Sequence, residues 1–362
     1  MTTLPHDLAR TISERGLDPD LVVRTIEACL DEDLRGGTDV TTESIFGEAA
    51  DRADIRARQN GCLAGVPVAA AVLHVLADRT GTNVEFTTHL DDGTRVSPGD
   101  AVATVSGPLG ARLAAERTML NLASHLSGVA TATSQWVDAL ASTDTKVRDT
   151  RKTVPGLRDL DKYAVRCGGG LNHRMGLSDA ALVKDNHIAA AGSLTAAVEA
   201  VRSHRPDIVC EVECDTVGQV REAIEAGVTT ILLDNMDDAL MTESVSICRP
   251  RGVVTEASGG LTLDRAKDVA ATGVNYIAVG AITHSAPVLD LGPASARPAP
   301  RTHHGRGLVP VTDTSPLVVS ADLSNQLSLL RAPRNPARQR SRLTRATATN
   351  GMLTGQASTH SP

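Results

Sequence analysis

The feature that most constrains the fold is a regular alternation of short apolar runs and helical segments between Lys146 and Leu291. Six runs typical of strands recur there, at 146–150, 181–186, 208–214, 230–235, 253–257 and 276–281. Helical segments separate most of them, and two of these begin at plausible N-cap residues, Ser193 and Thr262. Strands joined by helices at this pitch lie parallel, and continuous apolar runs predict a sheet buried on both faces.

The carboxyl ends of these strands carry polar residues or glycine. In chain order they are Arg151 and Lys152, Lys184, Glu213, Asp234, Ser258 and Gly280. In an α/β barrel the carboxyl ends of all strands converge on one mouth, whereas an open doubly wound sheet uses only the ends beside its switch point. Polar residues at six consecutive strand ends therefore favour an α/β barrel with its binding site at that mouth.

The composition divides the chain into three regions. Residues 1–115 mix helix and strand patterns and predict an N-terminal α/β, sandwich-like domain, and residues 116–291 are assigned to the barrel domain. The long apolar periodicity of 109–141 is expected to form two helices. Residues 292–362 have eight prolines and no aromatic residue, and we expect a disordered tail, because such a segment cannot bury enough apolar surface to offset its ordering entropy.

Charge and cysteine usage exclude several functional classes. The net charge is −7, but residues 291–362 carry nine arginines and two aspartates, so the acidic excess lies in the first 290 residues. An acidic body argues against nucleic-acid binding as the main activity. The sequence has no apolar run of roughly 18 residues and no visible secretory signal, so we expect no membrane attachment and a cytoplasmic location. The six cysteines form no CxxC pair, which favours reduced thiols over a zinc site.

Several cationic or potentially cationic side chains gather in this acidic body. They are, in chain order, Arg151, Lys152, His173, Arg174 and Lys184. Their convergence at one mouth predicts an anionic ligand, because unpaired cations would repel one another. A guanidinium offers a planar fork that matches a carboxylate, and a lysine ammonium suits phosphate. Arg148 is instead expected to form a structural ion pair with a nearby aspartate.

Two acidic residues complete the charged set. Glu213 and Asp234 end strands that are neighbours in the predicted barrel, so their carboxylates are expected within one cavity. Such a pair can hold Mg²⁺, accept hydrogen bonds from ribose hydroxyls or stabilise a cationic sugar. The residues alone leave these three roles of Glu213 and Asp234 open.

A glycine-rich loop supplies the expected phosphate site. Ser258, Gly259 and Gly260 follow a strand and precede a helix, which leaves backbone N–H groups free for a phosphate. Gly280 ends the last strand, with His284 nearby, and glycine loops after late strands match the usual phosphate site of barrels. Cations, acids and this loop together fit a sugar phosphate with an anionic leaving group and an anionic acceptor.

These motifs resemble the quinolinate phosphoribosyltransferases (nicotinate-nucleotide pyrophosphorylases, carboxylating) over about residues 5–291. The segments that carry the resemblance are ERTMLN (116–121), HLSGVATAT (125–133), RDTRKTVPGLR (148–158), KYAVRCGGGLNHR (162–174), KDNH (184–187), EVE (211–213), LLDN (232–235) and ASGG (257–260). The resemblance implies a homodimer of an N-terminal α/β domain and an open, incomplete barrel. It also implies decarboxylating phosphoribosyl transfer to quinolinate with Mg²⁺ as cofactor.

The resemblance also assigns residues to substrates. Arg117 is implied to reach into the partner subunit's site, and the quinolinate carboxylates are assigned to Arg151, His173, Arg174 and Lys184, with Thr150 in the same binding set. The phosphoribosyl group and Mg²⁺ are assigned to Lys152, Glu213 and Asp234, of which all three are expected to be catalytic. The 5-phosphate is assigned to Ser258, Gly259, Gly260 and Gly280, with His284 nearby.

Three alternatives stay open at this point. A Schiff-base aldolase would use Lys184 as its nucleophile, although a small keto acid needs fewer cations. A non-catalytic sensor of a phosphorylated ligand would have no need of the Glu213 and Asp234 pair. A phosphoribosyltransferase for nicotinate or another aromatic acid would explain the number of arginines less well than a dicarboxylate does.

Overall fold

The computed structural model describes residues 2–46 and 49–295. The segment 296–362, which forms most of the predicted tail, lies outside the described residues. None of the described helices is both long and apolar enough to cross a membrane. The six cysteines are free thiols, as expected.

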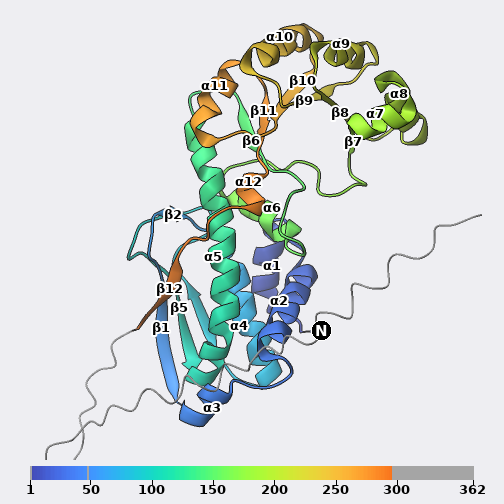
Figure 1. Ribbon diagram of the computed structural model, residues 1–362. Helices are drawn as coiled ribbons and strands as arrows, with labels where there is room; N and C mark the ends of the chain where they lie inside the picture. The colour runs from blue at the N-terminus through green and yellow to red at the C-terminus, as the bar shows by residue number, and fades with distance from the viewer. Residues whose placement is uncertain (1, 47–48, 296–362) are drawn as a thin grey trace, which may run out of the picture. The chain divides into compact units, whose positions relative to one another are not determined.

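The N-terminal part combines helices with an antiparallel sheet (Figure 1). Its helices are α1 (His6–Glu14), α2 (Pro19–Leu34), α3 (Val40–Phe46) and α4 (Val66–Thr80). Its strands are β1 (Ala50–Ala57), β3 (Glu85–Thr88) and β5 (Ala101–Pro108), with a separate two-stranded ladder of β2 (Gly61–Cys62) and β4 (Arg95–Val96). Helix α2 begins with Pro19 in its first turn, where the Asp18 side chain accepts the Asp20 N–H.

A last strand, β12 (Leu291–Ser295), returns to this sheet and pairs antiparallel with β1. The sheet order is β12-β1-β5-β3. Residues 292–295, which the sequence analysis assigned to the tail, are therefore part of a folded strand. No local pattern predicts this strand, because it contains Pro293 and is stabilised by a partner more than 200 residues earlier in the chain.

Helix α5 (Leu109–Ala139) is one continuous helix, where the sequence analysis expected two. Gly128 within this helix is a packing requirement. A Cβ built on Gly128 would lie 2.2 Å from the Pro287 carbonyl oxygen, so only glycine lets the helix approach that segment. The boundary predicted at 115/116 falls inside this helix.

The predicted parallel strands are present as a six-stranded sheet of order β6-β11-β10-β9-β8-β7. They are β6 (Lys146–Arg148), β7 (Ala181–Val183), β8 (Cys210–Cys214), β9 (Thr230–Asp234), β10 (Val254–Ser258) and β11 (Tyr276–Ala278). The helices of this part are α6 (Arg158–Cys167), α7 (Asp185–Ala191), α8 (Leu194–His204), α9 (Val217–Glu225), α10 (Asp238–Cys248), α11 (Ala266–Ala271) and α12 (Ala281–His284). Short 3-10 turns at Arg249–Arg251 and Leu263–Arg265 complete it.

The sheet is an open barrel, as predicted. Within the described ranges its edge strands β6 and β7 are not paired with each other. A single parallel bridge joins Arg148 to Leu171, so the segment after α6 lies along the free edge of β6. Helices α8 to α10 pack against the outer face of the strands (Figure 1).

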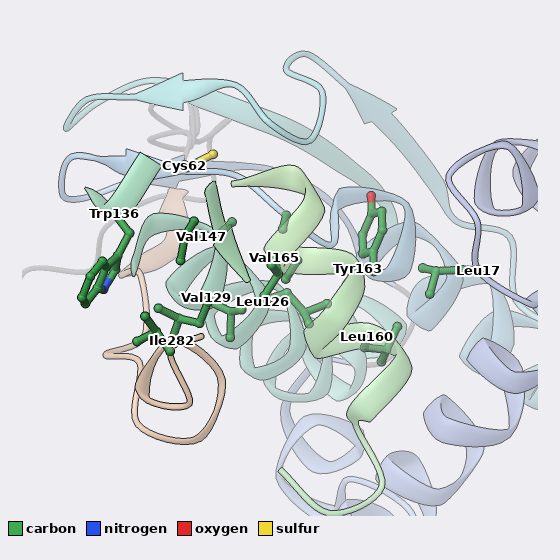
Figure 2. Packing of buried hydrophobic residues seen from close by; sticks show 14 of the residues in the cluster. Leu17, Cys62, Leu126, Val129, Trp136, Val147, Leu160, Tyr163, Val165 and Ile282 are labelled. Atoms are coloured by element: carbon green, nitrogen blue, oxygen red, sulfur yellow. The ribbon is translucent and has the colours of Figure 1, made fainter. Parts of the chain in front are cut away.

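The apolar core is continuous between α5 and the barrel. Figure 2 shows Leu126, Val129 and Trp136 of α5 together with Leu160 and Val165 of α6 in one buried cluster. Each of these side chains is at most 6% exposed. With aromatics at only 1% of the sequence, this core is mainly aliphatic, with Trp136 and Tyr163 as its aromatic members.

Candidate active site

A cavity of about 440 Å³ opens at the carboxyl ends of the parallel strands. It is lined by Thr150, Arg151, Lys152, His173, Arg174, Leu182, Lys184, Glu213, Leu232, Asp234, Asn235, Glu256, Ser258, Gly259, Gly260 and Ala278. Eleven of the fourteen predicted substrate-binding residues are in this set. The fold thus brings most of the predicted residues together around one cavity.

Strand alternation directs these side chains inward. In β8, Cys210, Val212 and Cys214 are buried on one face, and the residues between them, Glu211 and Glu213, face the barrel interior. The parallel register then places Glu213 opposite Leu232 of β9. The same register places Ser258 opposite Asp234, so strand ends from β8, β9 and β10 converge.

Within the described ranges, three of the predicted cations, Arg151, Lys152 and Arg174, have no acidic partner. Among the residues that the structure describes, no carboxylate lies within ion-pairing distance of Arg151 or Lys152, and the buried Nε of Arg151 has no hydrogen-bond partner. A buried donor without a partner is rare in proteins and costs stability. An anion bound on this side of the cavity would supply the missing partner.

Arg174 and Lys184 have protein partners. The Arg174 Nη1 donates to the Ala180 carbonyl at 2.8 Å, which leaves the rest of its guanidinium free. Burial, and then the neighbouring Arg151, lowers the pKa of Arg174. Lys184 forms an ion pair with Glu213, which links the cationic side of the cavity to the acidic side.

The two predicted acids line the cavity and are half-buried. Asp234 accepts from the Asn235 side chain at 2.5 Å, and Asn235 adopts a left-handed backbone with φ 53°. Half-buried carboxylates that face a shared cavity suit Mg²⁺, which usually takes one or two carboxylates and fills its other positions with water and phosphate oxygens. The residues present thus fit the expected metal.

The glycine loop after β10 packs against the same asparagine. A Cβ on Gly259 would lie 2.2 Å from the Asn235 Oδ1, and Gly259 has φ +98°, a conformation that favours glycine. Any side chain at Gly259 would therefore displace Asn235 beside Asp234. The loop keeps backbone rather than side chains at this wall of the cavity.

Three predicted residues do not line the cavity. Gly280 and His284 lie beside Lys152, since a Cβ on Gly280 would be 3.0 Å from the Lys152 Cδ and 3.3 Å from the His284 Nε2. Gly280 is the N-cap residue of α12 rather than the last residue of β11. Arg117 is exposed on α5 and is not among the residues that line the cavity.

The floor of the cavity is an ionic network that sequence reasoning missed. Glu256 is 0% exposed and accepts from the Arg148 Nη1 at 2.8 Å, so Arg148 pairs with Glu256 rather than with a nearby aspartate. The His173 Nε2 lies 2.9 Å from Glu211 and 3.4 Å from Glu256. The signal for Glu211 and Glu256 is their spacing, two residues before a strand-end residue and so on the same inward face.

Burial and neighbouring charges shift the pKa values of Glu256 and His173 in this network. Burial, and then Glu211, raises the pKa of Glu256. Burial alone would lower the pKa of His173, but the hydrogen bond to Glu211 and the charge of Glu256 raise it overall. The His173 Nδ1 accepts the Arg174 backbone N–H at 2.7 Å, so the Nε2 carries the hydrogen that faces the two glutamates.

Comparison with known proteins agrees with this geometry. Residues 39–127 match the family model of the quinolinate phosphoribosyl transferase N-terminal domain, and residues 129–292 match that of the C-terminal domain. The nicotinate-nucleotide pyrophosphorylase (carboxylating) of Mycobacterium leprae is 46% identical over 272 residues, which cover 74% of this chain and 95% of that protein. The probable enzyme of the same name from Bacillus subtilis is 43% identical over 261 residues, covering 72% and 88%.

Solved structures lead to the same family. The crystal structure of NadC from Streptococcus pyogenes is 35% identical with a TM-score of 0.72, and the alignment covers 82% of this chain and 98% of that chain. The nicotinate-nucleotide pyrophosphorylase from Francisella tularensis gives a TM-score of 0.71 at 36% identity, covering 76% and 95%. With both domains matched and relatives covered almost end to end, the chain belongs to the quinolinate phosphoribosyltransferase family.

Proposed function

We propose that this protein transfers the phosphoribosyl group of phosphoribosyl pyrophosphate to quinolinate and releases pyrophosphate and carbon dioxide, giving nicotinate mononucleotide for NAD biosynthesis. The observation that carries the proposal is the composition of one cavity. Arg151 and Lys152, without acidic partners, share it with Glu213, Asp234 and the glycine loop. Membership of the family and the names of relatives at 42–46% identity support the same reaction.

The acceptor is assigned to the cationic side. Quinolinate carries two neighbouring carboxylates, and the guanidinium groups of Arg151 and Arg174 offer paired donors of matching geometry. His173, Lys184 and Thr150 belong to the same set. Three apolar cavity residues, Leu182, Leu232 and Ala278, provide a surface for the pyridine ring.

The phosphoribosyl group is assigned to the opposite side. Lys152 would bind pyrophosphate oxygens, and Glu213 and Asp234 would stabilise positive charge that develops at C1 of the ribose. The loop of Ser258, Gly259 and Gly260 would receive the 5-phosphate, with Gly280 and His284 beside Lys152.

Mg²⁺ is part of the proposal, and Glu213 and Asp234 are the residues that would hold it. Bound there, the ion would neutralise charge on the leaving pyrophosphate. This assignment predicts that a chelator abolishes turnover and that added Mg²⁺ restores it.

The chemistry then requires positioning more than acid–base catalysis. The pyridine nitrogen attacks C1 as the bond from C1 to pyrophosphate breaks, and pyrophosphate leaves with the electron pair. The ring nitrogen is now positively charged, so the bond from the adjacent carbon to its carboxylate can break. Carbon dioxide leaves, the electron pair stays on that carbon beside the cationic nitrogen, and a proton from solvent completes nicotinate mononucleotide.

A homodimer, in which Arg117 of one subunit enters the partner's site, is also proposed. Arg117 is exposed on α5 and free to contribute to another chain. A cytoplasmic location belongs to the same proposal, since phosphoribosyl pyrophosphate is too highly charged to cross a bilayer unaided.

The test is an assay of the purified protein with phosphoribosyl pyrophosphate and Mg²⁺, using quinolinate or nicotinate as acceptor. We expect mononucleotide from quinolinate and at least about tenfold less from nicotinate, because one carboxylate leaves cations of the cavity unpaired. Equal or better use of nicotinate would identify a phosphoribosyltransferase for another aromatic acid. The aldolase alternative is disfavoured because the Lys184 ammonium is engaged by Glu213, and borohydride should trap no adduct on Lys184.

A further inference from the structure

A second charged cluster lies beside the cavity without lining it. Asp149, directly after β6, and Lys162 of α6 are both 0% exposed, and the Lys162 Nζ lies 2.5 Å from the Asp149 Oδ1. Burying two charges costs hydration energy, and a well-packed apolar pair often stabilises a fold as well or better. The presence of this pair in the core therefore calls for a role other than stability.

The contacts of the pair converge on one short segment, residues 171–174. The Asp149 Oδ1 also accepts the His173 backbone N–H at 2.8 Å, and its Oδ2 accepts from the Asn172 side chain at 2.6 Å. The Lys162 Nζ also donates to the His173 carbonyl at 3.0 Å. Both backbone polar groups of His173 are thus held by one buried ion pair.

Outside the pair, the segment is held by Arg166, which donates to the Asn172 Oδ1 at 2.7 Å, and by Glu211 on the His173 ring at 2.9 Å. It lies at the open edge of the barrel, where a single bridge between Arg148 and Leu171 replaces a full strand ladder. The missing ladder bonds are replaced by hydrogen bonds made by side chains, namely those of Asp149, Lys162 and Asn172. The next residues along the segment, His173 and Arg174, are cavity residues assigned to the acceptor.

We propose that Asp149, Lys162 and Asn172 form a positioning unit that fixes His173 and Arg174 on the acceptor side of the cavity, so that its loss weakens quinolinate binding far more than phosphoribosyl pyrophosphate binding. The inference rests on the proposed function, because it assigns the two sides of the cavity to those two substrates. The loop of Ser258–Gly260 and the acid Asp234 belong to β9 and β10 and make no contact with the unit. Burial lowers the pKa of Lys162 and raises that of Asp149, and their contact opposes both shifts.

The experiment compares three variants by KM for each substrate and by kcat. Lys162→Met keeps most of the length of the side chain and removes its charge. Asn172→Ala, at a partly exposed position, removes the side-chain hydrogen bonds to Asp149, to the Lys162 carbonyl and from Arg166. The control is His125→Gln, which removes a contact of 2.6 Å between α5 and Asp161 of the same helix α6 without touching residues 171–174.

We expect Lys162→Met to raise KM for quinolinate by about tenfold or more, with KM for phosphoribosyl pyrophosphate within about twofold. Asn172→Ala should also raise KM for quinolinate. If Lys162→Met does not fold, the result for Asn172→Ala tests the proposal by itself. An equal rise for both substrates, unchanged constants in a folded variant, or the same rise in His125→Gln would overturn the proposal.

Hydrogen exchange gives a readout that needs no turnover. In the ligand-free protein, Lys162→Met should speed exchange of the amides at 171–174 and leave those at 254–258 unchanged. Exchange that is unchanged at 171–174 would refute the positioning unit. A wild-type protein that does not use quinolinate would instead refute the proposed function, and the exchange result would still decide the structural claim.

Discussion

Arg151 and Arg148 stand three residues apart and have opposite surroundings. Arg148 pairs with Glu256 at 2.8 Å and lies over the ring of Tyr276, whose centroid is 4.0 Å from the guanidinium carbon. Arg151 has no acidic partner within the described ranges. The sequence correctly predicts an ion pair for Arg148, but it names the wrong partner, because Glu256 is 108 residues away.

Arg151→Ala should reduce kcat/KM for quinolinate by about 100-fold, as expected for the loss of a charge-assisted, bidentate contact worth about 3 kcal/mol. The melting temperature should change little, because no buried acid loses its partner. The matched control is Arg221→Ala, whose exposed pair with Glu243 at 3.5 Å is remote from the cavity. Equal activity of Arg151→Ala and wild type would refute the assignment.

His173 should stabilise the protein most at acidic pH. Its pKa is raised above the usual 6.5, so the imidazolium contributes fully below about pH 6.5 and that contribution is lost as pH rises through the raised value. The groups facing it are Glu211, Glu256 and Arg148. Urea unfolding of wild type and His173→Asn should show a gap in unfolding free energy that is larger at pH 6 than at pH 9; a gap that widens with pH would contradict this.

Sequence reasoning found the residues of the site that end strands, and it missed those that depend on distant contacts. A charged residue stands out in the sequence where it follows an apolar run, as Lys184, Glu213 and Asp234 do. Lys162 lies within a helix whose periodicity does not show that its charge is buried against Asp149. A buried ion pair is a tertiary feature, so neither half of it is distinguishable from a surface charge in one sequence.

At the scale of elements, strand positions were predicted within a few residues, because buried parallel strands give continuous apolar runs. Helix α5 and strand β12 were not, and the reason is the same for both. The Pro287 carbonyl leaves no room for a side chain at residue 128 of α5, and β12 is stabilised by pairing with β1. Both partners are far away in the sequence. Local patterns cannot report such contacts.

Gly128→Ala should destabilise the protein by about 2 kcal/mol, because the new methyl group overlaps the Pro287 carbonyl oxygen. Gly110→Ala, in the first turn of the same helix, meets only a Thr42 methyl group at 3.4 Å and should be neutral or stabilising by up to about 1 kcal/mol. Chemical unfolding of both variants measures the difference. Equal stability of the two would show that Gly128 is not a packing requirement.

A chain that ends after Ser295 should keep its activity, whereas one that ends after Asp290 should lose at least about 2 kcal/mol of stability. The shorter chain lacks β12, with its pairing to β1 and the buried side chain of Leu291, which is 6% exposed. Melting temperature and the quinolinate assay compare the two truncations. Loss of activity in the longer one would assign a role to residues 296–362.

At the scale of the whole molecule, the proposed dimer makes a quantitative prediction. Arg117→Ala and Arg151→Ala subunits should each be inactive alone, because every homodimer site lacks one arginine. Refolded together in equal amounts, half of the dimers are mixed and each mixed dimer has one intact site, so activity should return to about a quarter of the wild type. No recovery above the sum of the separate variants would contradict a shared site.

The central claim is that one cavity couples transfer of the sugar to loss of the carboxylate beside the ring nitrogen. The most direct measurement uses quinolinate labelled in that carboxylate, with phosphoribosyl pyrophosphate and Mg²⁺, and follows labelled carbon dioxide and mononucleotide together. We expect one carbon dioxide for each mononucleotide, and neither product when phosphoribosyl pyrophosphate is omitted. Mononucleotide without labelled carbon dioxide, or carbon dioxide without the sugar donor, would contradict the claim.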